Sequence, residues 1–290
     1  MKYALVHKHA GKMSIAKASR LLGARRQGYY EWCKRREDPR ALADRLMTVK
    51  IKNIFYESRR VYGARKIQAF LRRDGVYTSR KRIRRLMLCA GLVPVTYRRY
   101  VNTTDSRASQ LIFPNLLCQN FRTDAVNRVW VSDMTYVPTD EGWLYLCSIL
   151  DLYSRRVVGW AVGKTIDQNL AISALANAVR NRNPRKGLIF HTDRGCQYAS
   201  SGFRNAVARM GGIQSMSRSG NPYDNACAES FFKTLKVECL NTMHFSSRTQ
   251  AIRTIQEYLL YYNRVRIHAS LSYLSPVDFE DCLKLPQRAS

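Results

Sequence analysis

Three short β-rich runs follow one another between residues 128 and 163 with almost no chain between them. The runs are RVWVSDMTYVP, WLYLCSILDLY and RVVGWAVG; the turn TDEG separates the first two, and the segment SRR, whose last residue opens the third run, follows the second. Connections this short join antiparallel neighbours, because a parallel pair needs a crossover of about a dozen residues or more. The sequence therefore predicts a three-stranded antiparallel meander, and this feature limits the fold of the body more than any other.

A helix and a further strand follow the meander. The segment TIDQNLAISALANAVRNRN has Thr165 or Asp167 as its N-cap and carries apolar residues at helical spacing. The run Leu188–Phe190 predicts a buried strand. Beyond it we expect a helix near 201–209, a loop SMSRSGNPYDN, and helices at about 225–240 and 247–263. Hairpin strands, a helix and a strand that joins the same sheet predict a mixed sheet covered by helices, which is an α/β layered domain.

Positive charge is concentrated in the amino-terminal part of the chain. Residues 1–122 contain 29 Lys or Arg and 7 Asp or Glu, whereas the remaining 168 residues contain 20 and 14. The asymmetry separates a basic arm from a more neutral body, with the boundary in or shortly after NTTDSRASQ at 102–110. We expect a helix-turn-helix-like segment at 1–40, a second helix-turn-helix module at 41–100, a linker at 101–122, and the body with its C-terminal helices at 123–284.

The formal net charge of +28 indicates a polyanionic partner. Nucleic acid is favoured over an anionic membrane surface, because its phosphates release counterions when Lys and Arg neutralise them. The sequence contains no run of about 18 apolar residues that would span a bilayer, and the opening MKYALVHKHAGKM is too short in apolar residues for a signal peptide. We expect a cytoplasmic, nucleoid-associated protein.

Each half of the arm contains two short helical segments separated by glycine. In the first, Ser14 caps a helix that Gly23 ends, and a second helix follows. In the second, a helix from about Ala64 to Asp74 is followed by one that Ser79 caps. This arrangement is typical of a helix-turn-helix, although a solvated basic helix is the alternative for each segment. The candidate DNA-binding residues of the arm are Arg65, Lys66, Arg80, Lys81, Arg82, Arg84 and Arg85.

Three carboxylates interrupt apolar segments of the body. Asp133 lies inside the first strand, where a charge costs free energy unless it is paired or binds a cation. Asp193 follows the strand of GLIFHTDRGCQYAS, and Glu229 shares one edge of its helix with Lys233 and Lys236. Their structural alternatives are a hydrogen-bond acceptor, a turn former and half of an exposed Glu–Lys pair. If the three converge, they would bind two Mg²⁺ ions about 4 Å apart, an arrangement suited to phosphodiester displacement.

Six segments along nearly the whole chain resemble the second-frame (OrfB) transposase of the bacterial insertion-sequence-three family, within the DDE/retroviral-integrase superfamily. They are YGARKI, WVSDMTYVPTDEGWLYL, LDLYSRRVVGW, HTDRGCQY, SRSGNPYDNACAESFFKTLKVE and YYNRVRIHASLSYLSP. Asp133, Asp193 and Glu229, with 35 residues between the last two, match the DD(35)E carboxylates. The resemblance implies an RNase H-like mixed five-stranded sheet flanked by helices, the integrase catalytic core, preceded by an all-α helix-turn-helix DNA-binding arm.

The resemblance also implies roles for particular residues. Asp133, Asp193 and Glu229 become the catalytic metal ligands, with Mg²⁺ as the cofactor and Mn²⁺ as a substitute. Lys236 matches the basic residue that contacts DNA near the cleaved bond, and Lys233 is a weaker candidate. We expect Asp151 to be structural and His191 to shape the site rather than act as a general base.

The implied reaction is DNA transposition in two steps. Water frees a 3′-hydroxyl at an element end, and that hydroxyl then attacks another phosphodiester. The implied partners are double-stranded DNA of the terminal repeats and the target, further copies of the chain in the synaptic complex, and an upstream-frame (OrfA) protein or a fusion with it. The chain starts at its own Met and has no sustained heptads, as expected of a downstream half. The alternatives are a catalytically silent DNA-binding regulator and an RNase H-like nuclease that cleaves without joining.

Overall fold

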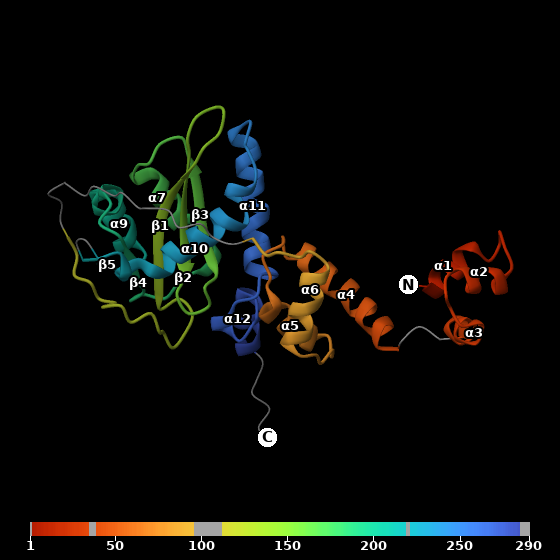
Figure 1. Cartoon of the computed structure of the whole chain (residues 1–290). Coiled ribbons are helices and arrows are strands. Elements are labelled where there is room, and N and C mark those ends of the chain that lie inside the picture. Colours follow the sequence, from red (N-terminus) through yellow and green to blue (C-terminus); the bar gives the residue numbers. More distant parts are fainter. Residues whose placement is uncertain (1, 35–38, 96–111, 219–220, 285–290) are drawn as a thin grey trace, which may run out of the picture.

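A helical arm and an α/β body make up the computed structural model, which describes residues 2–34, 39–95, 112–218 and 221–284 (Figure 1). The expected boundary at 102–110 lies outside the described residues. Residues 112–122 belong to the expected linker, and this segment contacts the body, because the Leu117 side chain is buried among the body's apolar residues. No helix in the described ranges is long and apolar enough to cross a membrane.

The body is built on one five-stranded sheet in the order β3-β2-β1-β4-β5. Strands β1 (Val129–Val137), β2 (Leu144–Asp151) and β3 (Val157–Gly163) are antiparallel neighbours, so the predicted meander is confirmed. Strand β4 (Ile189–Thr192) runs parallel to β1 and pairs with it only as far as the Val131–His191 register. The second half of β1 therefore extends beyond β4 and leaves that edge of the sheet open.

The expected loop 215–225 was wrong at its start, because Ser215 and Met216 belong to strand β5 (Ile213–Met216), which is parallel to β4. The four-residue strand places polar side chains in the interior, where hydrogen bonds satisfy them. The Gln214 amide donates to the Tyr198 carbonyl at 2.7 Å, and the Ser215 hydroxyl lies 2.8 Å from a His191 ring nitrogen. A strand without apolar alternation gives no periodic signal.

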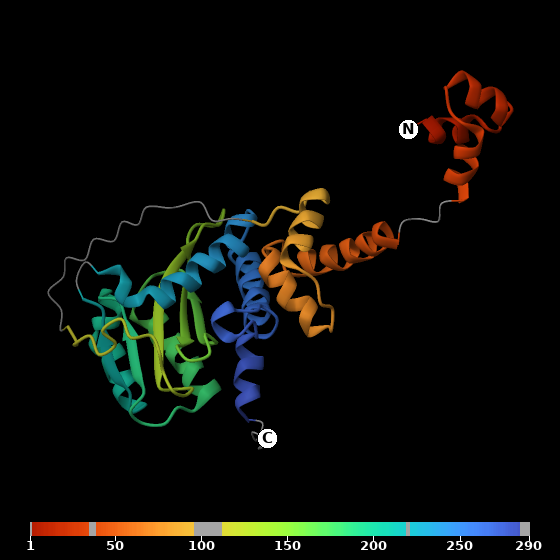
Figure 2. The ribbon, with the colours of Figure 1, turned by 60° about the horizontal axis from the view of Figure 1, so that its bottom comes forward.

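Helices cover both faces of the sheet (Figures 1 and 2). Helices α7 (Gln168–Arg182) and α9 (Ser201–Arg209) pack on one face, and α8 (Cys196–Ala199) connects β4 to that layer. Helices α10 (Ala226–Glu238) and α11 (Arg248–Arg264) pack on the other. Successive β1 residues point to opposite faces, so Trp130 lies in the α7 layer and Val131 in the α10 layer. The mixed sheet with flanking helices is thus confirmed.

The arm contains six helices within the described ranges. Helices α1 (Lys2–His9), α2 (Ile15–Leu21) and α3 (Arg26–Lys34) form a small cluster, and α4 (Pro39–Glu57), α5 (Ala64–Arg73) and α6 (Arg80–Cys89) form a second. The predicted caps are present, because the hydroxyls of Ser14 and Ser79 accept hydrogen bonds from the Lys17 and Arg82 amides. Helices α1 and α4 were not anticipated from the sequence.

The second cluster of the arm packs against the C-terminal segment of the body (Figure 2). Ile267, just after α11, is fully buried among the apolar residues of α4, α5 and α6. The Ile267 amide donates to the Tyr62 hydroxyl at 2.8 Å. Arg73 also pairs with Asp278 of helix α12 (Pro276–Lys284) at 3.7 Å. This part of the arm is therefore fixed to the body by a shared core.

Candidate active site

The three candidate carboxylates lie around the open edge of β1. Asp133 is on β1 beyond its pairing with β4, Asp193 directly follows β4, and Glu229 is in the first turn of α10. Because β1 and β4 are parallel, the chain leaves β4 at the same end of the sheet toward which β1 continues. The amide of Asn225 donates to the Ser132 carbonyl at 3.2 Å and so ties the beginning of α10 to β1.

Local hydrogen bonds orient two of the carboxylates. The Asp133 carboxylate accepts the Met134 amide at 2.7 Å, and the Asp193 carboxylate accepts the Gly195 amide at 3.0 Å. Each of these bonds uses one carboxylate oxygen. The other oxygen of each group has no hydrogen bond to the described residues.

The three carboxylates lie close enough to affect one another's pKa. The pKa of Asp133 is raised to about 8, first by burial and then by the charges of Asp193 and Glu229, while the Met134 amide and Lys236 act to lower it. Burial also raises the pKa of Asp193. The pKa of Glu229 is raised by burial and then by Asp193. The structure therefore brings together the three residues that the sequence singled out.

The donor set fits a hard divalent cation, although the side chains do not form a ready-made ligand cage. Across the described residues, no three His, Cys, Asp or Glu side chains are arranged as a metal-binding group. The three carboxylates nevertheless offer only oxygen ligands, which Mg²⁺ prefers. Their mutual repulsion is a free-energy cost that a bound cation would relieve. The uncompensated charge of the carboxylates is thus negative, and a bound cation would neutralise it.

Basic and aromatic side chains border the carboxylates. The Lys236 ammonium lies 5.2 Å from the centre of the Tyr136 ring and acts to lower the pKa of Asp133. Lys233 is exposed one turn earlier on α10. Tyr136 in turn makes an edge contact with Trp143 at 5.0 Å between ring centroids, and both rings are exposed. The surface beside the carboxylates can therefore bind an anionic, partly aromatic ligand.

The residues expected to support the site are buried and hydrogen-bonded. His191 is fully buried between the hydroxyls of Ser215 and Ser217, and burial lowers its pKa to about 4, so it is neutral at pH 7. Asp151 accepts the Asn127 amide at 2.7 Å and pairs with Arg182 at 3.4 Å. These contacts place both side chains within the framework of the sheet.

Sequence reasoning missed Asp224, which organises the approach to α10. Its fully buried carboxylate accepts two bonds of 3.0 Å from the Arg218 guanidinium and one of 3.1 Å from Gln119. The Arg218 bonds, with the backbone amide of Arg218 and Gln119, hold the pKa of Asp224 far below its usual range. The only signal was an Asp in the NPYDN turn, which turn chemistry alone explains.

The candidate DNA-binding residues of the arm fall into three groups. Arg82 and Arg85 pair with Asp44 of α4, at 2.7 Å for Arg82. Lys66 lies 4.8 Å from the centre of the Tyr62 ring, and burial lowers its pKa to about 8. The remaining members are exposed: Lys81 and Arg84 on α6, and Arg65 and Arg80 at the rim of a cavity.

The five-stranded mixed sheet with flanking helices is that of an integrase-type core, and the matching family models agree. Models described as "Integrase core domain" match residues 123–222 and 211–276, and one described as "HTH-like domain" matches 41–100. Among solved structures, the HTLV-2 integrase catalytic core domain in complex with magnesium aligns with 17% identity and a TM-score of 0.40, over 53% of this chain and 97% of that one.

Two curated relatives extend the match over most of the chain. The transposase for insertion sequence element IS904 of Lactococcus lactis is 41% identical over 247 residues, which cover 85% of this chain and 98% of that protein. Transposase InsF for insertion sequence IS3A of Escherichia coli K12 is 37% identical over 288 residues, covering 97% and 99%. The chain therefore belongs to the IS3 family of insertion-sequence transposases.

Proposed function

We propose that this chain is a DDE transposase that binds element-end DNA and catalyses Mg²⁺-dependent 3′-end cleavage and strand transfer. The observation that carries the proposal is the placement of Asp133, Asp193 and Glu229 around the open edge of β1, close enough for Asp193 to act on the pKa of the other two. A protein that needed only this fold would gain stability by replacing at least one of these carboxylates with a neutral residue. The presence of three carboxyl groups at one partly buried place is explained by a cation that would stabilise their ionised forms.

Asp133, Asp193 and Glu229 would hold the cation, with Mn²⁺ as a substitute for Mg²⁺. When bound, Mg²⁺ supplies electrostatic stabilisation of the charge that develops on the phosphate under attack. Lys236 binds a phosphate oxygen near the cleaved bond, because it lies beside Asp133 and points its charge toward the same edge. Lys233, on the same edge of α10, contacts the strand one phosphate further along.

The chemistry is two successive displacements at phosphorus. In the first, a water oxygen bonds to phosphorus, the P–O3′ bond breaks, and the released 3′-oxygen takes up a proton. In the second, that 3′-hydroxyl oxygen attacks another phosphodiester, loses its proton, and displaces a new 3′-oxygen. Neither step requires a covalent bond between protein and DNA.

The arm would hold the substrate, which is double-stranded DNA of the terminal repeats and of the target. Its second cluster, made of α4, α5 and α6, carries exposed cations and is fixed to the body, so bound DNA is presented to the core at a constant position. Bringing two ends together requires at least two protomers, and the upstream-frame protein or a fusion with it is the further partner. We place the working protein in the cytoplasm, on nucleoid DNA.

The test is incubation of the purified protein, alone and fused to its upstream frame, with labelled element-end DNA and Mg²⁺ or Mn²⁺. Asp193→Asn is the inactive variant, because it keeps the side-chain shape and the Gly195 hydrogen bond. Cleavage together with joined product, absent in this variant, is the expected result. DNA binding without Asp193-dependent cleavage would instead identify a silent regulator, and cleavage without joining would identify an RNase H-like nuclease.

A further inference from the structure

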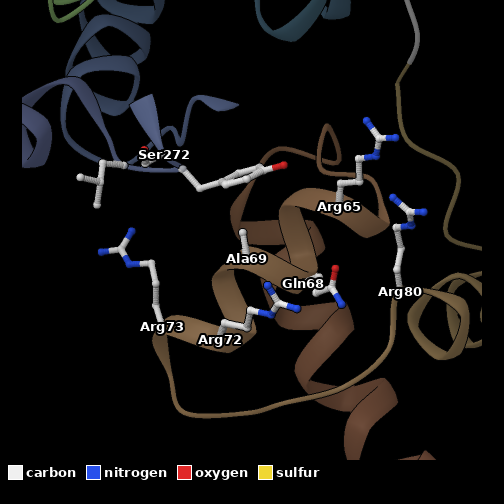
Figure 3. A pocket seen from close by; sticks show the side chains of 9 residues that line it. Arg65, Gln68, Ala69, Arg72, Arg73, Arg80 and Ser272 are labelled. Carbon is white, nitrogen blue, oxygen red and sulfur yellow. The ribbon is translucent and has the colours of Figure 1, made fainter. Parts of the chain in front are cut away.

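Four arginines surround a cavity of about 470 Å³ between the arm and the C-terminal segment of the body (Figure 3). Helix α5 contributes Arg65, Arg72 and Arg73, and Arg80 stands at the first position of α6. The opposite wall is the turn of Ser272, Tyr273 and Leu274, which follows α11. The cavity is thus built by two parts of the chain about 200 residues apart.

Helical spacing explains why these side chains share one space. Arg65, Gln68 and Arg72 are three and seven positions apart, so they lie on one face of α5. Ala69, on the same face, leaves room between them. The Gln68 amide donates to the Thr78 carbonyl at 2.8 Å and ties α5 to the segment that leads into α6. This bond holds Arg80 at the rim of the same cavity.

The charge of the cavity is largely uncompensated. Among the described residues, no carboxylate lies within ion-pair distance of Arg65, Arg72 or Arg80. Arg73 pairs with Asp278 at 3.7 Å, with both side chains nearly half exposed. Guanidinium groups gathered in this way repel one another unless an anion lies between them. The planar guanidinium groups match the geometry of the oxygen atoms in phosphate and carboxylate groups.

The turn that closes the cavity has an unusual and firmly held backbone. Ser272 and Tyr273 adopt left-handed conformations, with φ of 53° and 60°, which non-glycine residues rarely take. Backbone bonds hold the turn, because the Tyr273 amide donates to the His268 carbonyl at 2.8 Å and the His268 amide to the Leu274 carbonyl at 3.0 Å. A strained backbone conformation of this kind persists only where the surrounding structure holds it, and such conformations are common at functional sites.

We propose that this cavity binds backbone phosphates of double-stranded DNA and is completed jointly by α5 and the 272–274 turn. The proposal rests on the proposed function, because it takes the substrate to be DNA. Arg65 and Arg73 are separated by about 12 Å along the helix axis, which is too far for both to bind one phosphate and so suits a strand with several phosphates better than one isolated anion. Lys81 and Arg84, exposed on α6, extend the basic surface away from Arg80. DNA seated here contacts the arm and the body at once.

The first experiment measures how duplex binding depends on salt. Fluorescence anisotropy of a labelled element-end duplex would be titrated at several salt concentrations with the full chain, Arg65→Gln and Arg72→Gln. Each phosphate contact adds about 0.9 to the slope of log affinity against log salt, so each variant should show a slope smaller by about that amount. Arg209→Gln is the matched control, because Arg209 is exposed on α9 at the opposite end of the body (Figure 1).

The second experiment tests whether the turn belongs to the site. Ser272→Asp adds a negative charge to the turn wall while all four arginines remain, and Asp tolerates the left-handed backbone of this position. We expect roughly a tenfold or larger loss of duplex affinity at low salt. Ser201→Asp, at an exposed position of α9, adds the same charge elsewhere and should change affinity by less than about twofold.

Three results would overturn the proposal. One is a salt slope for Arg65→Gln and Arg72→Gln equal to that of Arg209→Gln. Another is equal affinity of the two Asp variants. A third is saturable displacement of the duplex by ATP beyond that caused by chloride of equal ionic strength, which would assign the cavity to a free nucleotide. Cleavage and joining by the unmodified chain are measured separately, so any of these results leaves the proposed function standing, whereas failure of all DNA binding ends both.

Discussion

Replacing Asp133 with Asn should make the protein more stable and abolish its activity. Asn keeps the shape of the side chain and its oxygen can still accept the Met134 amide. The substitution removes a charge that burial, Asp193 and Glu229 all disfavour. The same charge is required if the site binds a cation, so the two effects have one physical cause.

The size of the stabilisation follows from the raised pKa of Asp133. The pKa increases from 3.8 to about 8 in the folded chain. At pH 7 the carboxyl is ionised in the unfolded chain and mostly protonated in the folded chain, so folding requires the uptake of a proton. Because pH 7 lies about three units above the unfolded pKa, this uptake destabilises the folded chain by at most about 4 kcal/mol. Because the folded pKa is raised, this destabilisation is absent below pH 4, grows as pH rises, and is complete above pH 8. The advantage of Asp133→Asn should grow in the same way.

Thermal unfolding in EDTA at pH 4, 7 and 8.5 measures the effect. Each kcal/mol corresponds to roughly 2–4 °C for a domain of this size, so Asp133→Asn should unfold several degrees above the unmodified chain at pH 7 and at nearly the same temperature at pH 4. Asp124→Asn is the matched control, because Asp124 is 82% exposed and should show no such pH-dependent gain.

Adding Mg²⁺ should narrow the difference in stability between the two proteins. A cation at 100 times its dissociation constant stabilises the folded unmodified chain by about 2.7 kcal/mol, and Asp133→Asn should lose most of this gain. The reasoning fails if, without metal at pH 7, Asp133→Asn unfolds at or below the temperature of the unmodified chain. It also fails if Mg²⁺ raises the unfolding temperature of both proteins equally.

Three further predictions concern the framework. Glu280→Gln should destabilise the body by about 3 kcal/mol in urea unfolding, because it breaks a buried ion pair with Arg182 at 2.8 Å. Gly159→Ala should cost about 1–3 kcal/mol in the same assay, because the new methyl group would lie 2.5 Å from the Ala178 methyl of α7. Burial and neighbouring cations lower the pKa of His268 to about 2, so stability should fall as pH drops below about 6.5, and His268→Gln should flatten this acid limb of a Tm–pH curve.

The sequence predicted the meander and α7 because local signals specify them. Short turns determine which strands are neighbours, and the N-cap and apolar spacing mark the helix, with the Asp167 side chain accepting the Leu170 amide. Strand β5 lacked such a signal, because its pairing with β4 is long-range and two of its three buried residues, Gln214 and Ser215, are polar. The role of Asp133, Asp193 and Glu229 came from a resemblance, since spacing cannot show that residues 60 and 36 positions apart meet.

The ion pairs of the arm were the feature that could least be predicted from the sequence. From helical periodicity alone, every basic residue of α6 was an equal candidate for contact with DNA. In the structure, Arg82 and Arg85 form ion pairs with Asp44, which lies on α4, a helix that the sequence did not predict. Lys66, by contrast, lies over the ring of a close sequence neighbour, Tyr62. Which cations of a basic helix are available to DNA depends on neighbours about 40 residues away, and only the tertiary structure supplies them.

The helix that carries Glu229 also connects the active site to the arm. Glu238, at the far end of α10, accepts bonds from Arg266 at 2.7 Å and from the Tyr258 hydroxyl at 2.8 Å, and all three side chains are buried. Arg266 directly precedes Ile267, whose side chain completes the core of the arm. Breaking one partner of a buried ion pair leaves an uncompensated charge, so this contact resists displacement. If the second cluster of the arm binds a DNA end as proposed, that end is held at a fixed distance from the carboxylates, through one helix of about 20 Å and one buried ion pair.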